Sequence, residues 1–116
     1  MTVSSRMSML SSIAAVVALV FSASVFAEID ADAAKKTARK NSCFKCHAPD
    51  KEKEGPPFSK VAEKYRGKAD AEQKVIEQIT TGKKAKFPDG HEDEHKIIET
   101  QDKDEIKNLA DWILSL

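Results

Sequence analysis

The feature that most constrains this chain is the run Cys43-Phe44-Lys45-Cys46-His47, which holds its only two cysteines. Two cysteines separated by two residues, with a histidine directly after the second, form the attachment signature of a c-type haem. The spacing suits the chemistry, because two thiols must reach two vinyl groups on one porphyrin edge while the imidazole lies beneath the iron. We therefore expect one covalently bound haem c per chain, attached through Cys43 and Cys46, with His47 as the proximal iron ligand.

Three other interpretations of the two cysteines remain open. A thioredoxin-like redox pair is typical of a βαβ context, and no strand-like alternation is visible here. A zinc site usually takes four ligands, and His47, His91 and His95 are available to complete one. A short-loop disulfide needs no further residue. We favour haem over all three, because the histidine follows the second cysteine directly.

The first 27 residues have the pattern of an export signal. Arg6 supplies a positive charge, Met9 to Phe21 is largely apolar, and Val25 to Ala27 has the small residues of a cleavage site. The apolar run is shorter than the roughly 20 residues that a transmembrane helix needs, although an uncleaved anchor is the alternative. We predict a cleavable signal peptide over residues 1–27, a periplasmic location and no stable membrane association of the mature chain, residues 28–116.

Charge and size narrow the classes of function. The 19 lysines and arginines equal the 19 aspartates and glutamates in number, whereas a nucleic-acid-binding domain shows a basic excess, so we expect no nucleic-acid partner. Residues 28–116 form one small domain with a limited core, which a covalent haem would enlarge. Nothing resembles the acid–base or nucleophilic groups of an enzyme, so we expect a protein that is not a catalyst; a weak peroxidase-like activity would require an open iron site.

Apolar residues recur at helical spacing in four segments, and Asp30, Asp70 and Asp102 stand at N-cap positions. Alanines make a narrow stripe on the first segment, and we expect that stripe to pack against the apolar face of the last. Glu105, three residues after Asp102, resembles the second half of a capping box. The expected helices cover residues 28–41, 58–66, 70–81 and 102–116, and the stretch 83–101 is the least regular.

A loop over residues 48–57 follows the haem motif, and the cluster Gly55-Pro56-Pro57 breaks regular structure there. Histidines that ligate a metal usually donate their second ring N–H to a carbonyl or carboxylate, which fixes the tautomer. We expect a backbone carbonyl near Pro56 or Pro57 to play this part for His47.

Taken together, the pieces resemble the small bacterial class I cytochromes c over essentially all of residues 28–116. The resemblance implies an all-α cytochrome c fold, with N- and C-terminal helices packed together around one covalent haem. It also implies electron transfer to redox partner proteins that dock at an exposed haem edge. The matching pieces are residues 43–47, Gly55-Pro56, residues 61–67, the helix end at 79–82 and residues 109–115.

One departure from the family pattern concerns the iron. The family places a methionine before the last helix as the second axial ligand, but the methionines of this chain are Met1, Met7 and Met9, all within the expected signal peptide. The corresponding region holds His91 and His95 instead, and imidazole is a suitable iron ligand. The resemblance therefore implies a haem ligated by two histidines.

Both histidines remain open as the distal ligand. Counting back from Trp112 favours His95, counting forward from Gly82 favours His91, and a five-coordinate iron is the third alternative. We favour His95, because the two isoleucines that follow it suit a haem face. Methionine ligation raises the haem potential, so its absence predicts a low-potential electron carrier. The alternative function is a haem protein that binds or senses a small gas through a displaceable distal histidine.

Overall fold

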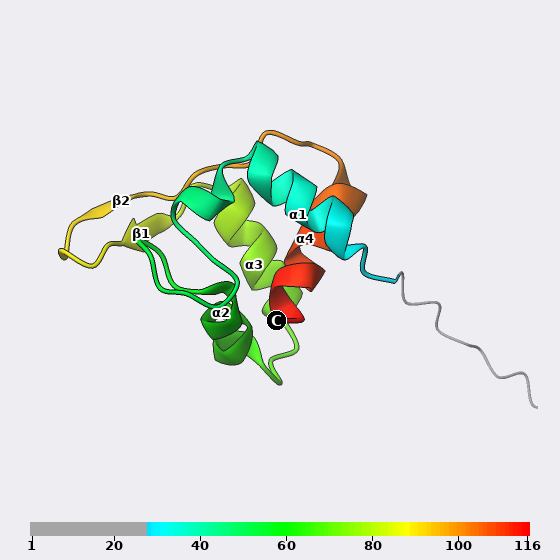
Figure 1. Cartoon of the computed structure of the whole chain (residues 1–116), viewed down its shortest axis with the longest axis horizontal. Helices are drawn as coiled ribbons and strands as arrows, with labels where there is room; N and C mark the ends of the chain where they lie inside the picture. The colour runs from blue at the N-terminus through cyan, green and yellow to red at the C-terminus, as the bar shows by residue number, and fades with distance from the viewer. Residues whose placement is uncertain (1–27) are drawn as a thin grey trace, which may run out of the picture.

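The computed structural model describes residues 28–116, and the expected signal peptide lies outside the described residues. The elements in chain order are α1 (Ala31–Lys40), the 3-10 turn η1 (Cys43–Lys45), α2 (Phe58–Tyr65), α3 (Ala71–Thr80), β1 (Lys84–Lys86), β2 (Glu92–Glu94) and α4 (Lys103–Leu114). Figure 1 shows the helices grouped together, with the β1–β2 hairpin projecting to one side. The predicted all-α class is confirmed, and the hairpin is an addition to it. Within the described part of the chain, no helix combines the length and apolar character needed to cross a bilayer.

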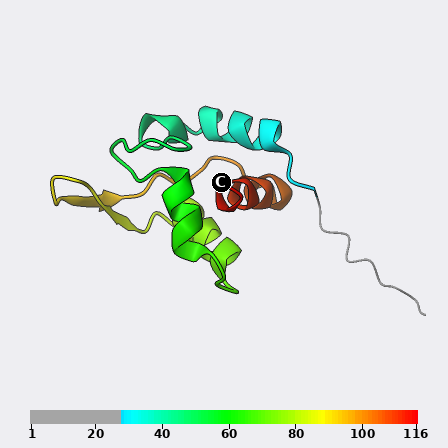
Figure 2. The ribbon, with the colours of Figure 1, turned by 60° about the horizontal axis from the view of Figure 1, so that its bottom comes forward.

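Small side chains let α1 and α4 approach closely, as the alanine stripe predicts. Ala34 and Ala38 of α1 and Leu109 and Ala110 of α4 have no exposed surface. Figure 2 shows α1 lying alongside α4. Burying apolar surface of this kind is the main favourable term in folding, so the contact between α1 and α4 is a central part of the hydrophobic core.

The helix starts follow the predicted capping in part. Asp30 accepts a hydrogen bond from Ala33 N at 2.9 Å, and Asp102 accepts from two amides of the first turn of α4. Asp70 stands at the N-cap position of α3, but its side chain makes no capping hydrogen bond. The capping box at α4 is incomplete, because the Glu105 carboxylate bonds two threonines outside the helix instead of the backbone of Asp102.

The stretch expected to be least regular contains an antiparallel hairpin. Lys84 pairs with Glu94, Ala85 with Asp93 and Lys86 with Glu92. Opposite charges therefore face each other at two of the three positions, which favours pairing. Strands of three mostly charged residues carry none of the β-branched or alternating pattern that identifies a strand in a sequence, which explains why the hairpin was not predicted.

Candidate haem-binding site

A cavity of about 850 Å³ lies between the Cys43–His47 turn, α2, α3 and the hairpin. This volume is typical of sites for small molecules and cofactors. Its walls are largely apolar, with side chains from α2, α3, the segment after β2 and α4. The lining includes Cys43, Cys46, His47 and His95, and it also includes Val61, Tyr65, Val75, Ile79, Ile98 and Ile113.

The two cysteines lie on one tight turn that brings them to the same wall. Ser42 has a left-handed backbone with φ of 59°, and the 3-10 turn that follows is closed by hydrogen bonds from Cys46 N and His47 N to Cys43 O at 3.2 and 2.9 Å. The two sulfurs are not joined to each other. Burial raises the pKa of the Cys43 thiol, and burial together with the neighbouring Glu54 carboxylate raises that of Cys46. Reactive dithiols have depressed pKa values instead, so the redox-pair interpretation loses support.

The His47 ring is held on three sides. Its Nδ1 lies 2.7 Å from Pro56 O, as the sequence predicted for this part of the loop. Phe58 stacks on the ring at a centroid distance of 5.0 Å and an angle of 19°. A Cβ on Gly55 would lie 2.5 Å from His47 Cε1, so any larger residue would force the ring or the loop to shift. With Nδ1–H donated to the carbonyl, Nε2 is left free as a ligand atom, and burial lowers the pKa of His47 and thereby favours the neutral ring.

His95 faces His47 across the cavity. The ring centroids are 6.0 Å apart with an angle of 40° between the planes. Its Nδ1 lies 2.9 Å from Lys96 O, which leaves Nε2 free in the same way. His95 N donates to Lys83 O at 2.9 Å, so the residue extends the hairpin ladder by one position.

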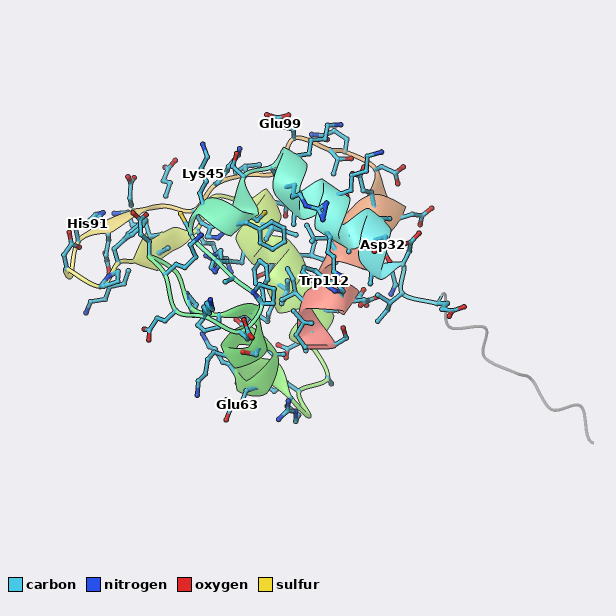
Figure 3. The ribbon with its side chains drawn as sticks, in the orientation of Figure 1. Asp32, Lys45, Glu63, His91, Glu99 and Trp112 are labelled. Atoms are coloured by element: carbon cyan, nitrogen blue, oxygen red, sulfur yellow. The ribbon has the colours of Figure 1, made fainter. Side chains whose placement is uncertain are left out.

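His91 lies at the far tip of the hairpin, as Figure 3 shows. Its ring stacks on Phe87 at 4.4 Å and its Nδ1 contacts the Asp89 carboxylate. The side chain is 54% exposed and is not part of the cavity wall. The structure therefore brings Cys43, Cys46, His47 and His95 around one cavity and leaves His91 outside it.

These residues fit a haem c better than the alternative groups. The donor set comprises two neighbouring thiols and two imidazoles with free Nε2 atoms, and the apolar walls suit a porphyrin. A zinc site would need more than two clustered ligands. Within residues 28–116, no three side chains of histidine, cysteine, aspartate or glutamate come together as a metal site.

Two groups of cavity residues were missed or given little weight from the sequence. Asn41 lines the cavity and is 1% exposed. In the sequence it is only the last residue of an expected helix, two residues before Cys43. The cavity wall is also rich in basic residues, which the balanced charge of the whole chain does not indicate. Its charged members are Lys45, Lys60, Lys64, Lys84, Lys86 and Lys96 against Glu54 and Glu94.

Comparisons with known proteins agree with this description. The family model described as Cytochrome c matches residues 31–116. Cytochrome c2 of Rhodocyclus tenuis is 32% identical over 80 residues, which cover 68% of this chain and 87% of that protein. The crystal structure of class 1 cytochrome MtoD from Sideroxydans lithotrophicus ES-1 is 65% identical, with a TM-score of 0.74, and covers 76% of this chain and 97% of that one. Cytochrome c552 of Nitrosomonas europaea is 30% identical, with a TM-score of 0.55, and covers 74% and 98%.

Proposed function

Because this chain belongs to the cytochrome c family, whose members carry covalent haem c and transfer electrons without catalysing a reaction of their own, we propose that it is a periplasmic, low-potential electron carrier with a bis-histidine haem. Cys43 and Cys46 would hold the haem through thioether bonds. His47 would be the proximal ligand and His95 the distal one. The bound haem supplies the redox chemistry, and the chain sets its ligands, its surroundings and its partners.

The observation that supports bis-histidine ligation is the 6.0 Å between the ring centroids of His47 and His95. A metal–imidazole bond is about 2 Å long, so two rings on opposite sides of one metal place their centroids roughly 6 Å apart. Both rings also engage Nδ1 with a backbone carbonyl. The pair is therefore arranged as two axial ligands of one iron would be.

The low potential follows from the ligand set. A thioether ligand raises the haem potential, and the described chain contains no methionine. A second imidazole is a stronger donor than a thioether and stabilises ferric iron. We therefore expect a midpoint potential below that of histidine–methionine relatives.

Export is supported by the N-terminal pattern, with Arg6 before an apolar run and small residues around Ala27. Docking of an acidic redox partner at the cavity mouth is supported by the charges described above. Six lysines and two glutamates line the cavity, whereas the whole chain has equal numbers of basic and acidic residues. Complementary charge raises the rate of association with such a partner.

The ligand assignment is tested with two matched variants, His95→Ala and His91→Ala, in the haem-loaded protein. We expect wild type and His91→Ala to give a six-coordinate low-spin ferric spectrum and to resist carbon monoxide when reduced. His95→Ala should become five-coordinate and bind carbon monoxide at once, and His95→Met should titrate at a higher potential than wild type. The opposite behaviour of the two alanine variants would assign His91 instead. Immediate carbon monoxide uptake by wild type would support the gas-binding alternative.

The docking surface is tested by charge reversal with equal changes in net charge. Lys60→Glu with Lys64→Glu alters the cavity wall on α2 without changing the hairpin pairs, whereas Lys35→Glu with Lys36→Glu alters α1 away from the cavity. We expect the first pair to slow oxidation by anionic ferricyanide at low ionic strength more than the second, and added salt should reduce the difference. Equal effects of the two pairs would mean that the charge around the cavity steers nothing.

A further inference from the structure

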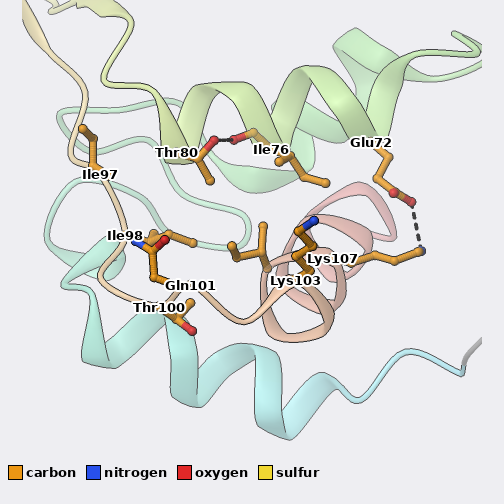
Figure 4. A pocket seen from close by; sticks show the side chains of 10 residues that line it. Glu72, Ile76, Thr80, Ile97, Ile98, Thr100, Gln101, Lys103 and Lys107 are labelled. Carbon is orange, nitrogen blue, oxygen red and sulfur yellow. Dashed lines mark hydrogen bonds and ion pairs between the residues drawn. The ribbon is translucent and has the colours of Figure 1, made fainter.

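The segment that carries the distal histidine onward to α4, residues 95–100, is called the distal segment here. It has little core packing of its own. Ile98 is buried, but Ile97 is 52% exposed and Glu99 is also exposed. On its side away from the haem cavity lies a groove of about 530 Å³ between α3 and α4. Figure 4 shows Ile97, Ile98 and Thr100 lying along this groove.

Hydrogen bonds to four separate elements hold the distal segment. His95 N donates to Lys83 O at the hairpin, and Ile98 N donates to Ile79 O at the end of α3, both at 2.9 Å. Thr100 Oγ1 donates to the Glu105 carboxylate of α4 at 2.7 Å. The fourth bond runs from Glu99 N to the side chain of Asn41 at 2.8 Å. Because packing is sparse, these bonds decide where the segment lies.

Asn41 differs from the other three anchors because it belongs to the haem-attachment side. Its Nδ2 donates to Thr37 O at 2.9 Å while its Oδ1 accepts from Glu99 N, so both ends of the amide are used. It is 1% exposed and lines the haem cavity. Only Ser42 separates it from Cys43. One buried side chain thus joins the backbone that anchors the haem to the backbone that carries the distal ligand.

We propose that Asn41 is a positioning residue that fixes the distal segment, and with it His95, at the distance from the haem-attachment turn that iron ligation requires. The proposal rests on the proposed role of His95 as distal ligand. Loss of the Asn41 amide removes the acceptor of Glu99 N–H, so one of the four hydrogen bonds that hold the distal segment is lost. The segment then relaxes outward, His95 leaves the iron more often, and the sixth position opens.

The test uses Asn41→Leu, which keeps the branched shape of the buried side chain and removes both hydrogen bonds, and Asn41→Asp, which keeps an acceptor for Glu99 N–H. The matched control is Asn108→Leu. Asn108 also uses its amide twice, accepting from Asp30 N and donating to Asp30 O at 2.9 Å each, but it lies on α4 away from the distal segment. The readout is the rate at which the ferrous haem protein binds carbon monoxide, together with the midpoint potential.

We expect Asn41→Leu to bind carbon monoxide at least tenfold faster than wild type and to have a raised midpoint potential. Asn41→Asp keeps the acceptor for Glu99 N–H but loses the donor to Thr37 O and buries a carboxyl group, so it should lie between wild type and Asn41→Leu. Asn108→Leu should match wild type even if its stability falls. Equal rates for the two leucine variants would overturn the role of Asn41 while leaving His95 ligation intact. A wild type that binds carbon monoxide at once would overturn the proposed ligation itself.

A second measurement covers the case in which Asn41→Leu does not yield haem protein. Amide hydrogen exchange of Glu99 in the wild-type protein reports the Asn41 bond directly. If Asn41 holds the Glu99 amide, this amide should exchange slowly although the residue is exposed. Its exchange rate should follow the rate at which the iron becomes accessible to carbon monoxide. Fast exchange of the Glu99 amide would contradict it.

Discussion

The two sides of the cavity are built in different ways. On the proximal side, five consecutive residues place two thiols and an imidazole, and the loop that follows supplies the glycine and the carbonyl that hold the His47 ring, eight and nine residues after it. On the distal side, His95 depends on a short exposed hairpin and on a segment anchored to α1, α3 and α4. The proximal side is local in sequence, and the distal side is assembled from distant pieces.

The difference also concerns what supports each side. Behind His47 stands an aromatic cluster, in which Phe58 contacts the histidine ring and Trp112 at centroid distances of 5.0 and 5.7 Å, and Phe44 contacts Trp112 at 6.4 Å. The hairpin that leads to His95 has only Phe87 and His91 stacked at its tip. Packing therefore holds the His47 ring and hydrogen bonding holds His95, so in the proposed haem complex His95 would be the easier of the two ligands to displace.

The largest expected difference between the two sides is the loss of stability when an aromatic side chain is removed. Trp112→Ala removes a side chain that is 3% exposed and touches both Phe44 and Phe58, so the free energy of unfolding should fall by about 3–5 kcal/mol. His91→Ala removes the half-exposed ring that stacks on Phe87 at the hairpin tip, outside the cavity wall, and should lower it by well under about 1 kcal/mol, as substitutions at exposed sites do. Denaturant unfolding of the haem protein measures both, and similar losses would mean that the hairpin is packed as firmly as the core.

The next contrast concerns the space around His47. A Cβ at residue 55 would lie 2.5 Å from His47 Cε1 and 3.0 Å from Cys46 O, so Gly55→Ala should cost about 1–3 kcal/mol of stability and distort the proximal ligand. Gly67→Ala is the control, because no atom lies within 4 Å of its Cβ and only its φ of 77° resists the change. We expect an altered ferric spectrum in Gly55→Ala alone. A normal spectrum in both variants would show that the loop yields easily.

The proximal side was easier to predict from the sequence than the distal side, because its residues are close together in the chain. The haem motif and the alanine stripe depend on spacing within one segment, and a spacing is visible in a sequence. The carbonyl partner of His47 was predicted to within two residues because only the short loop follows the motif. The choice between His91 and His95 depended on a hairpin of charged residues without a strand pattern, and the role of Asn41 depends on Glu99, 58 residues away.

The stability that Glu105 contributes should depend on pH. This residue anchors the far end of the distal segment through Thr100. Hydrogen bonds from Thr100 and Thr37 hold the pKa of Glu105 below its usual value of 4.5. A depressed carboxylate pKa stabilises the folded state above the unfolded pKa, and this contribution is lost as the pH falls through the folded pKa. Wild type should therefore exceed Glu105→Gln in stability by about 1 kcal/mol at neutral pH, and the difference should shrink below about pH 4.5. Unfolding curves from neutral pH to about pH 3 measure this, and a difference that stays constant would contradict it.

The smallest expected effect concerns the hairpin charges. Lys84 faces Glu94 across the two strands, and reversing one of them with Lys84→Glu places like charges opposite each other, which costs roughly 0.2–1 kcal/mol. Because the ladder continues from Glu94 to His95, through His95 N to Lys83 O, the loosened hairpin should raise the rate of carbon monoxide binding more than it lowers global stability. The double variant Lys84→Glu with Glu94→Lys restores the opposite charges and should restore the slow rate. If the double variant still bound carbon monoxide quickly, Lys84 would act through its charge beside the cavity and not through its pairing with Glu94. The position of His95 would then depend on the anchors of residues 95–100 alone.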